Sequence, residues 1–132
     1  NKITILRISK VRVDADAHSP NTTSVMETYE KATVIALEAS INYTDGGVVS
    51  KQVTKNEAGN ITLFAFDKGQ GLTEHTANFD AFVQVLDGEV EISIDRQPDL
   101  LKTGDCIIMP AGHPHALKAT QRFKMLLTMI RG

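Results

Sequence analysis

Apolar and polar positions alternate along most of this chain in short runs. Residues 90–94 show the pattern well, with Val90, Ile92 and Ile94 on one side and polar residues between them. Turn signals rich in glycine, proline and aspartate separate such runs at intervals of about eight to twelve residues. No regular alternation of strands with helices supports a parallel α/β sheet. The pattern predicts an all-β sandwich or barrel.

Two local features refine this expectation. Asp87–Gly88 lies between the apolar runs of residues 79–86 and 89–95, and Asp-Gly in that position predicts a tight hairpin turn. Cys106 begins the apolar segment 106–109, where we expect a small buried side chain. As the only cysteine, it excludes an intrachain disulfide and a multi-cysteine metal site.

Length and charge set limits on the classes of function. The chain has 132 residues, which suits one packed domain, and its net charge of −2 comes with no basic block, so no feature favours nucleic acid. No apolar run is long enough to span a bilayer, and the first residues alternate apolar and charged positions instead of forming a secretory leader. We expect a cytoplasmic protein without nucleic-acid or membrane partners.

The N-terminal part is less regular than the rest. A helix capped by Ser24 and a strand over residues 32–37 are both consistent with its pattern. We expect residues 1–40 to form an extension that packs on the barrel or on a partner subunit, and residues 41–132 to form the single domain.

Two segments carry a family resemblance. Residues 69–88 and 104–119 resemble the two motifs of the cupin superfamily, a family of small β-barrels. Gly69, His75 and Gly88 match the spacing of the first motif, while Gly104, Pro110, Gly112 and His115 match the second without a gap. The resemblance implies a double-stranded β-helix, the jelly-roll barrel, with residues 41–132 as the cupin domain, and it implies a homodimer.

The same resemblance implies a metal site that this chain does not complete. Metal-binding cupins use three histidines and one glutamate, but the second histidine position is Ala77 and the glutamate position is Ala81. His75 and His115 remain as metal ligands, and two imidazoles alone make a weak site. A third ligand would have to be His113 or Asp80; Asp80 needs a bulge to turn inward. With a third ligand, a divalent transition metal (Fe, Mn, Ni or Zn) is the expected cofactor.

Three functions are compatible with these residues. The first is binding of a small apolar or aromatic molecule inside the barrel, where an apolar pocket presents a few polar groups. The second is a metal-dependent enzyme of the dioxygenase, isomerase or decarboxylase type with an unusual ligand set. The third is metal-free acid–base catalysis by a histidine, which needs an orienting carboxylate. We rank binding first. The expected pocket residues are His75, Ala77, Phe79, Ala81, Val83, Ile92, Ile108, His115 and Met125.

Overall fold

The described part of the chain is almost entirely antiparallel β-structure. The computed structural model describes residues 28–131, so most of the expected N-terminal extension, residues 1–27, lies outside the described residues. One 3₁₀ turn precedes seven strands: η2 (Glu38–Ser40), β1 (Val48–Asn56), β2 (Gly59–Phe66), β3 (Gly71–His75), β4 (Asp80–Ile94), β5 (Gln97–Lys102), β6 (Cys106–Met109) and β7 (His115–Ile130). The all-β prediction is therefore confirmed. No helix among residues 28–131 is long and apolar enough to cross a membrane.

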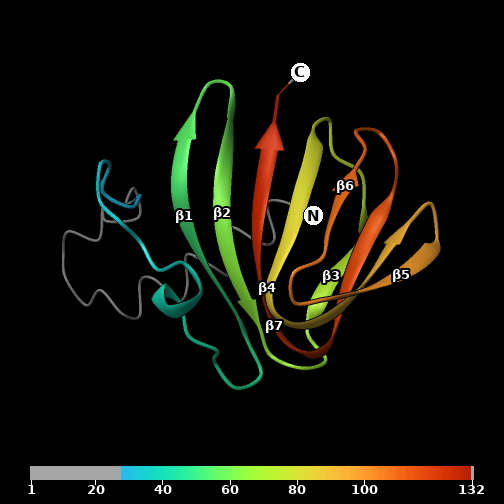
Figure 1. Ribbon diagram of the computed structural model, residues 1–132. Coiled ribbons are helices and arrows are strands. Elements are labelled where there is room, and N and C mark those ends of the chain that lie inside the picture. The colour runs from blue at the N-terminus through green and yellow to red at the C-terminus, as the bar shows by residue number, and fades with distance from the viewer. Residues whose placement is uncertain (1–27, 132) are drawn as a thin grey trace.

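Two long strands connect the two sides of the fold. The strand order is β1-β2-β7-β4-β5, with β3 pairing to β7 and β6 pairing to β4. β4 has 15 residues and β7 has 16. Each is long enough to pair with a different strand at each end: β4 pairs first with β6 and then with β5, and β7 pairs first with β3 and then with β2. In Figure 1 they bend from the side formed with β1 and β2 toward the side with β3, β5 and β6. This bending closes the sheet around one interior.

The bend in β4 corrects one expectation. Asp87–Gly88 is not a hairpin turn: it lies inside β4, where the register with β7 shifts on both sides of it. Asp-Gly suits a bulge as well as a turn, because both need positive φ, and Gly88 has a φ of +87°. The tight hairpin lies farther along, at Asp95 and Arg96, whose φ values of 53° and 64° fit a type I′ turn between β4 and β5.

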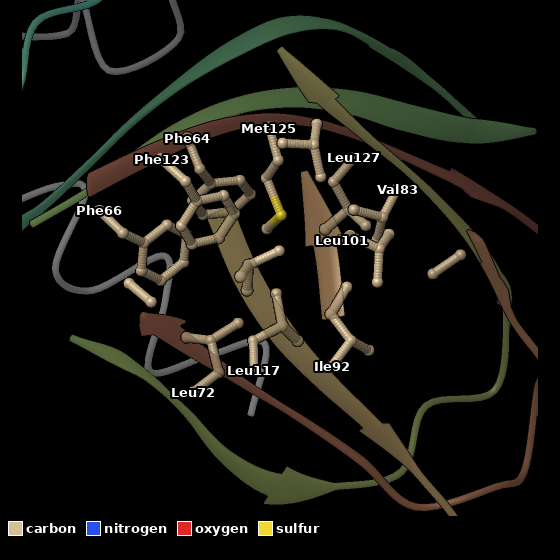
Figure 2. Packing of buried hydrophobic residues seen from close by; sticks show 14 of the residues in the cluster. Phe64, Phe66, Leu72, Val83, Ile92, Leu101, Leu117, Phe123, Met125 and Leu127 are labelled. Carbon is tan, nitrogen blue, oxygen red and sulfur yellow. The ribbon is translucent and has the colours of Figure 1, made fainter. Parts of the chain in front are cut away.

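The interior is filled mainly by apolar side chains from β2, β4 and β7. Phe66 and Phe123 stack with ring centroids 4.7 Å apart, and Phe64 lies 5.8 Å from Phe66. Figure 2 shows these rings together at one side of the core, with Met125 reaching into the same interior. On the opposite face of the sheet, Tyr29 and Leu37 pack against a smaller buried cluster of Ile41, Leu63 and Ala65.

Strand β6 contributes fewer buried residues than its composition suggests. Met109 is buried, whereas Cys106 and Ile108 are exposed. The expectation of a buried Cys106 is wrong, because the strand is covered on one face only and Cys106 lies on the other.

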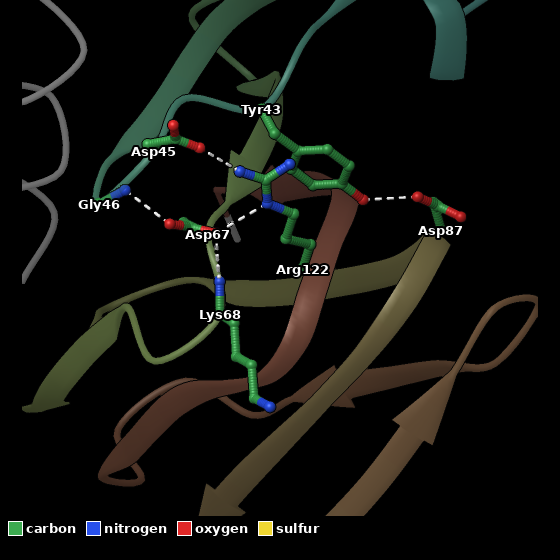
Figure 3. A network of polar contacts seen from close by, with 7 residues as sticks. All are labelled: Tyr43, Asp45, Gly46, Asp67, Lys68, Asp87 and Arg122. Atoms are coloured by element: carbon green, nitrogen blue, oxygen red, sulfur yellow. Dashed lines mark hydrogen bonds and ion pairs between the residues drawn. The ribbon is translucent and has the colours of Figure 1, made fainter.

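A network of hydrogen bonds and ion pairs connects polar side chains on the outer face of the sheet. The Arg122 guanidinium on β7 forms ion pairs with Asp45 and Asp67, and its centre lies 5.2 Å from the centroid of the Tyr43 ring. The Tyr43 hydroxyl donates to the Asp87 carboxylate (Figure 3). Hydrogen bonds from Arg122 and from two backbone amides lower the pKa of Asp67 to about 2. Burial and the bond to Asp87 raise the pKa of Tyr43 well above its usual value.

The bulge at Gly88 generates a testable prediction. A Cβ at Gly88 would overlap the carbonyl oxygen of Arg122, whereas a Cβ at Gly104, which has a similar φ of +96°, meets no atom within 4 Å. Gly104→Ala should cost about 1–2 kcal/mol of unfolding free energy from the left-handed backbone alone. Gly88→Ala should cost about 1–3 kcal/mol more, the usual scale for overpacking. Urea unfolding of the two variants measures the difference, and equal losses would contradict the close approach of β4 and β7.

Candidate functional site

A small cavity lies inside the barrel at the end where β3 and the start of β7 meet. It has a volume of about 20 Å³, close to the room that one water molecule needs. Most lining side chains are apolar, and histidine supplies the only polar ones. The lining consists of Leu72, His75, Ala77, Ala81, Met109, His115, Leu117, Met125, Leu127 and Met129.

Two histidines form the polar part of this cavity. His75 ends β3 and His115 begins β7, and the two residues are direct partners in the strand register. Their ring centroids lie 4.4 Å apart, with the rings edge to face at 67°. His115 is buried, while His75 is half-buried and lies nearer the solvent.

Backbone carbonyls orient both rings. Nδ1 of His75 lies 2.8 Å from the carbonyl oxygen of Thr73, and Nδ1 of His115 lies 3.2 Å from that of His113. A carbonyl oxygen only accepts hydrogen bonds, so each Nδ1 is the donor. In the neutral form of each ring the lone pair is therefore on Nε2.

The environment of His115 favours its neutral form. Burial lowers the pKa of His115 below its usual value of 6.5, and the nearby His75 lowers it further. The hydrogen bond to the His113 carbonyl opposes these effects in part. At pH 7 His115 is thus a neutral imidazole in an apolar cavity.

The structure brings five of the expected pocket residues together around the cavity. They are His75, Ala77, Ala81, His115 and Met125. The two alanines line the cavity at the positions where the family resemblance places a histidine and a glutamate.

The other four expected residues lie elsewhere. Val83 and Ile92 are fully buried in the core, outside the cavity lining. Phe79 is half-buried, and its ring centroid lies 5.3 Å from the Arg131 guanidinium. Ile108 is 61% exposed, so its placement in the pocket is wrong: β6 turns Met109 inward, and Ile108 has the opposite parity.

Sequence reasoning missed five lining residues: Leu72, Met109, Leu117, Leu127 and Met129. Three of these lie on β7 at odd-numbered positions, the same parity as His115. Because successive side chains of a strand point to opposite faces, counting by two from His115 would have found them. Met109 could have been predicted in the same way, but only once it was known which face of β6 points inward.

Neither expected third metal ligand reaches the cavity histidines. Asp80 accepts a hydrogen bond from the backbone amide of Ala111 at 2.9 Å, and Nδ1 of His113 lies 2.8 Å from the Asp95 carboxylate. No group of three His, Cys, Asp or Glu side chains within residues 28–131 is placed to hold a metal ion. Iron, manganese, nickel and zinc sites need more nitrogen or oxygen ligands than two imidazoles. The residues present do not fit such a cofactor.

The same contacts bear on acid–base chemistry. The rings of His75 and His115 are oriented by backbone carbonyls. Within residues 28–131, the histidine that pairs with a carboxylate is His113, and it and its partner Asp95 are half-exposed at the surface. The cavity therefore offers hydrogen bonding by two imidazoles within an apolar lining.

Comparisons with known proteins agree with this architecture. The family model for the cupin domain matches residues 62–130. Two solved structures that cover 80% of this chain are a conserved protein of unknown function, SPY1581, from Streptococcus pyogenes (35% identity, 93% of that chain, TM-score 0.76) and a cupin superfamily protein from Desulfitobacterium hafniense (26%, 97%, 0.74). A cupin 2 conserved barrel domain protein from Leptotrichia buccalis is 37% identical over 73% of this chain and 47% of its own, with a TM-score of 0.71. No curated protein matches the chain.

The burial of His115 predicts a pH dependence of stability. The unfolded chain takes up a proton at His115 near pH 6.5, whereas the folded chain resists protonation to lower pH. The unfolding free energy should therefore decrease as the pH falls below about 6.5, since the unfolded state then binds more protons. His115→Gln, which cannot protonate, should flatten this dependence between pH 7 and pH 5.

Two measurements check this prediction together. Urea unfolding at a series of pH values gives the slope, and NMR titration of the His115 ring proton gives its own midpoint. A midpoint at or above 6.5, or an unchanged slope in His115→Gln, would show that the ring is not held neutral by its surroundings.

Proposed function

We propose that this chain, which belongs to the cupin family, is a binding protein that holds a small apolar or aromatic molecule inside its barrel. The observation that carries the proposal is the composition of the cavity lining: apolar side chains surround a single pair of imidazoles, one of them buried. Such a lining, with few polar groups to fix orientation, is typical of small-molecule sites.

The size of the cavity sets a condition on this function. A volume of about 20 Å³ does not admit an aromatic ring, since a cavity that binds benzene has a volume of about 150 Å³. Three of the lining residues are methionines, Met109, Met125 and Met129, and methionine adapts to its contacts through three rotatable bonds. We expect these side chains to move when a ligand enters past the half-buried His75 and Ala77.

The imidazole pair suggests which ligands bind best. Nδ1 of His115 is turned to the His113 carbonyl, so Nε2 of the neutral ring acts as a hydrogen-bond acceptor. A ligand with one hydroxyl or N–H group on an apolar body matches that acceptor. Small phenols and cyclic alcohols should therefore bind more tightly than hydrocarbons of equal size.

The test uses the methionines as reporters. Protein labelled with ¹³C at the methionine methyl groups is titrated with benzene, phenol and cyclohexanol while methyl spectra are recorded by NMR. The signals of Met109, Met125 and Met129 should shift, with phenol giving the lowest dissociation constant. No shift with any fragment at millimolar concentration would refute the proposal.

A matched pair of variants locates the binding site. Ala77→Leu places a larger side chain in the cavity lining and should weaken binding by more than about tenfold, which corresponds to about 1.4 kcal/mol. Ala116→Leu makes the same change on β7 at an even-numbered position outside the lining, and it should leave binding intact. Equal affinities in the two variants would place the ligand elsewhere.

A further inference from the structure

The turn between β4 and β5 has a strained backbone. Asp95 and Arg96 occupy its two central positions, and both have positive φ values, 53° and 64°. A type I′ turn needs this conformation, and glycine is usual at its second central position. Aspartate tolerates the left-handed region, but a bulky residue such as arginine is an outlier there. Backbone strain of this kind persists where surrounding contacts hold it, and it is found at ligand sites and switch regions.

On one side, this turn is bound to the segment that leads into β7. The Asp95 amide donates a hydrogen bond to the carbonyl oxygen of Pro114 at 2.9 Å, and Nδ1 of His113 lies 2.8 Å from the Asp95 carboxylate. His113 and Pro114 directly precede His115, the buried histidine of the cavity. A backbone bond and a side-chain bond together therefore hold the turn beside His115.

On the other side, a contact between two exposed side chains joins the turn to the end of β3. The Arg96 guanidinium lies 3.2 Å from the Glu74 carboxylate, and Glu74 directly precedes His75. Within the described residues β3 pairs with β7 alone, and its register with β7 is irregular between Leu72 and His75. The last residues of β3 are therefore held less firmly than those of a strand that is paired regularly on both edges.

Another part of the cavity rim is closed by hydrogen bonds from backbone amides. The Gly112 amide donates to the carbonyl oxygen of Ala77 at 2.8 Å, and the Ala111 amide donates to the Asp80 carboxylate at 2.9 Å. These bonds join the start of β4 and the residues before it to the segment between β6 and β7. The rim is therefore held least firmly at the end of β3, beside the half-buried His75.

We propose that the Arg96–Glu74 ion pair is a latch on the cavity, and that its opening lets the end of β3 move away from the turn so that a molecule can pass His75. This inference rests on the proposed binding function and adds the route and the control of entry. The side chains of Arg96 and Glu74 are 78% and 41% exposed, and an exposed ion pair is weak. A pair of this strength favours the closed state by up to about fivefold and still allows frequent opening.

The first experiment compares the rates of phenol binding in two glutamine variants of the full chain. Glu74→Gln removes the negative charge of the latch and keeps the size of the side chain. Glu30→Gln makes the same change at an exposed glutamate beside Tyr29, which packs on the opposite face of the sheet. Association and dissociation rates are obtained by NMR from the exchange of the labelled methionine methyl signals during a phenol titration.

A latch predicts a particular pattern of rates. Glu74→Gln should raise the association rate and the dissociation rate of phenol together, by up to about fivefold. The dissociation constant should stay unchanged, because the latch acts on passage and not on the contacts of the bound molecule. Glu30→Gln should change neither rate. Added salt screens an exposed ion pair, so it should speed exchange in the parent protein and have less effect in Glu74→Gln.

A second experiment needs no bound organic molecule. Hydrogen peroxide oxidises the methionine thioether to the sulfoxide and is itself reduced to water, so the oxidation rate of the cavity methionines reports access to the cavity. Met109, Met125 and Met129 are all buried. Glu74→Gln should raise their oxidation rate by up to about fivefold, measured by mass spectrometry of peptides, while Glu30→Gln should not. Urea unfolding should give both variants the same free energy of unfolding, which shows that the opening is local.

The outcomes separate the latch from the proposed binding function. Unchanged phenol exchange or unchanged methionine oxidation in Glu74→Gln overturns the latch, and so does faster oxidation that only follows a loss of unfolding free energy. A weaker affinity that comes from the dissociation rate alone also overturns it, since Glu74 would then contact the bound molecule. If no fragment binds to the parent protein, the binding function fails, and the peroxide rates alone decide whether the latch controls access.

Discussion

The pairing of β4 with β7 is the constraint on which the rest of the structure depends. These strands pair from Asp80 with Ile130 at one end to Ile94 with His115 at the other. Because β7 also pairs with β2 and β3, it crosses from one side of the barrel to the other. Its inward-facing positions supply half of the residues that line the cavity. The strand that closes the barrel therefore also carries many of the side chains that face its interior.

That pairing holds only because β4 can bend at one place. Gly88 lies too close to the backbone of Arg122 to leave room for a Cβ atom. On the outer side of the same bend, hydrogen bonds join Tyr43 to Asp87 and Arg122 to Asp67. The bulge lets β4 continue as one strand, with Val83 and Ile92 both in the core on either side of it. The bulge also shifts the buried positions of β4 from odd numbers, as at Ala81 and Val83, to even numbers, as at Val90 and Ile92.

The alternation of apolar residues predicted most of the strands, and the resemblance of residues 69–88 and 104–119 to the two cupin motifs implied the barrel. Two errors have physical causes. Asp87–Gly88 satisfies a hairpin turn and a bulge equally, and only the distant partner strand β7 decides between them. Residues 106–109 are apolar at every position, so no alternation indicated that Met109 faces inward and Ile108 outward.

The polar residues near the cavity mouth show why its ligand set could not be read from composition. Asp80 binds the amide of Ala111, and His113 binds Asp95, so both side chains fix the segment between β6 and β7. Fixing that segment places the His113 carbonyl against Nδ1 of His115. Asp80 and His113, which the sequence suggested as further metal ligands, therefore help to orient the His115 ring instead. The side chains that remain to face the interior are two imidazoles among apolar groups. This follows from the positions of β6 and β7 on either side of Ala81, which the sequence of any one strand does not reveal.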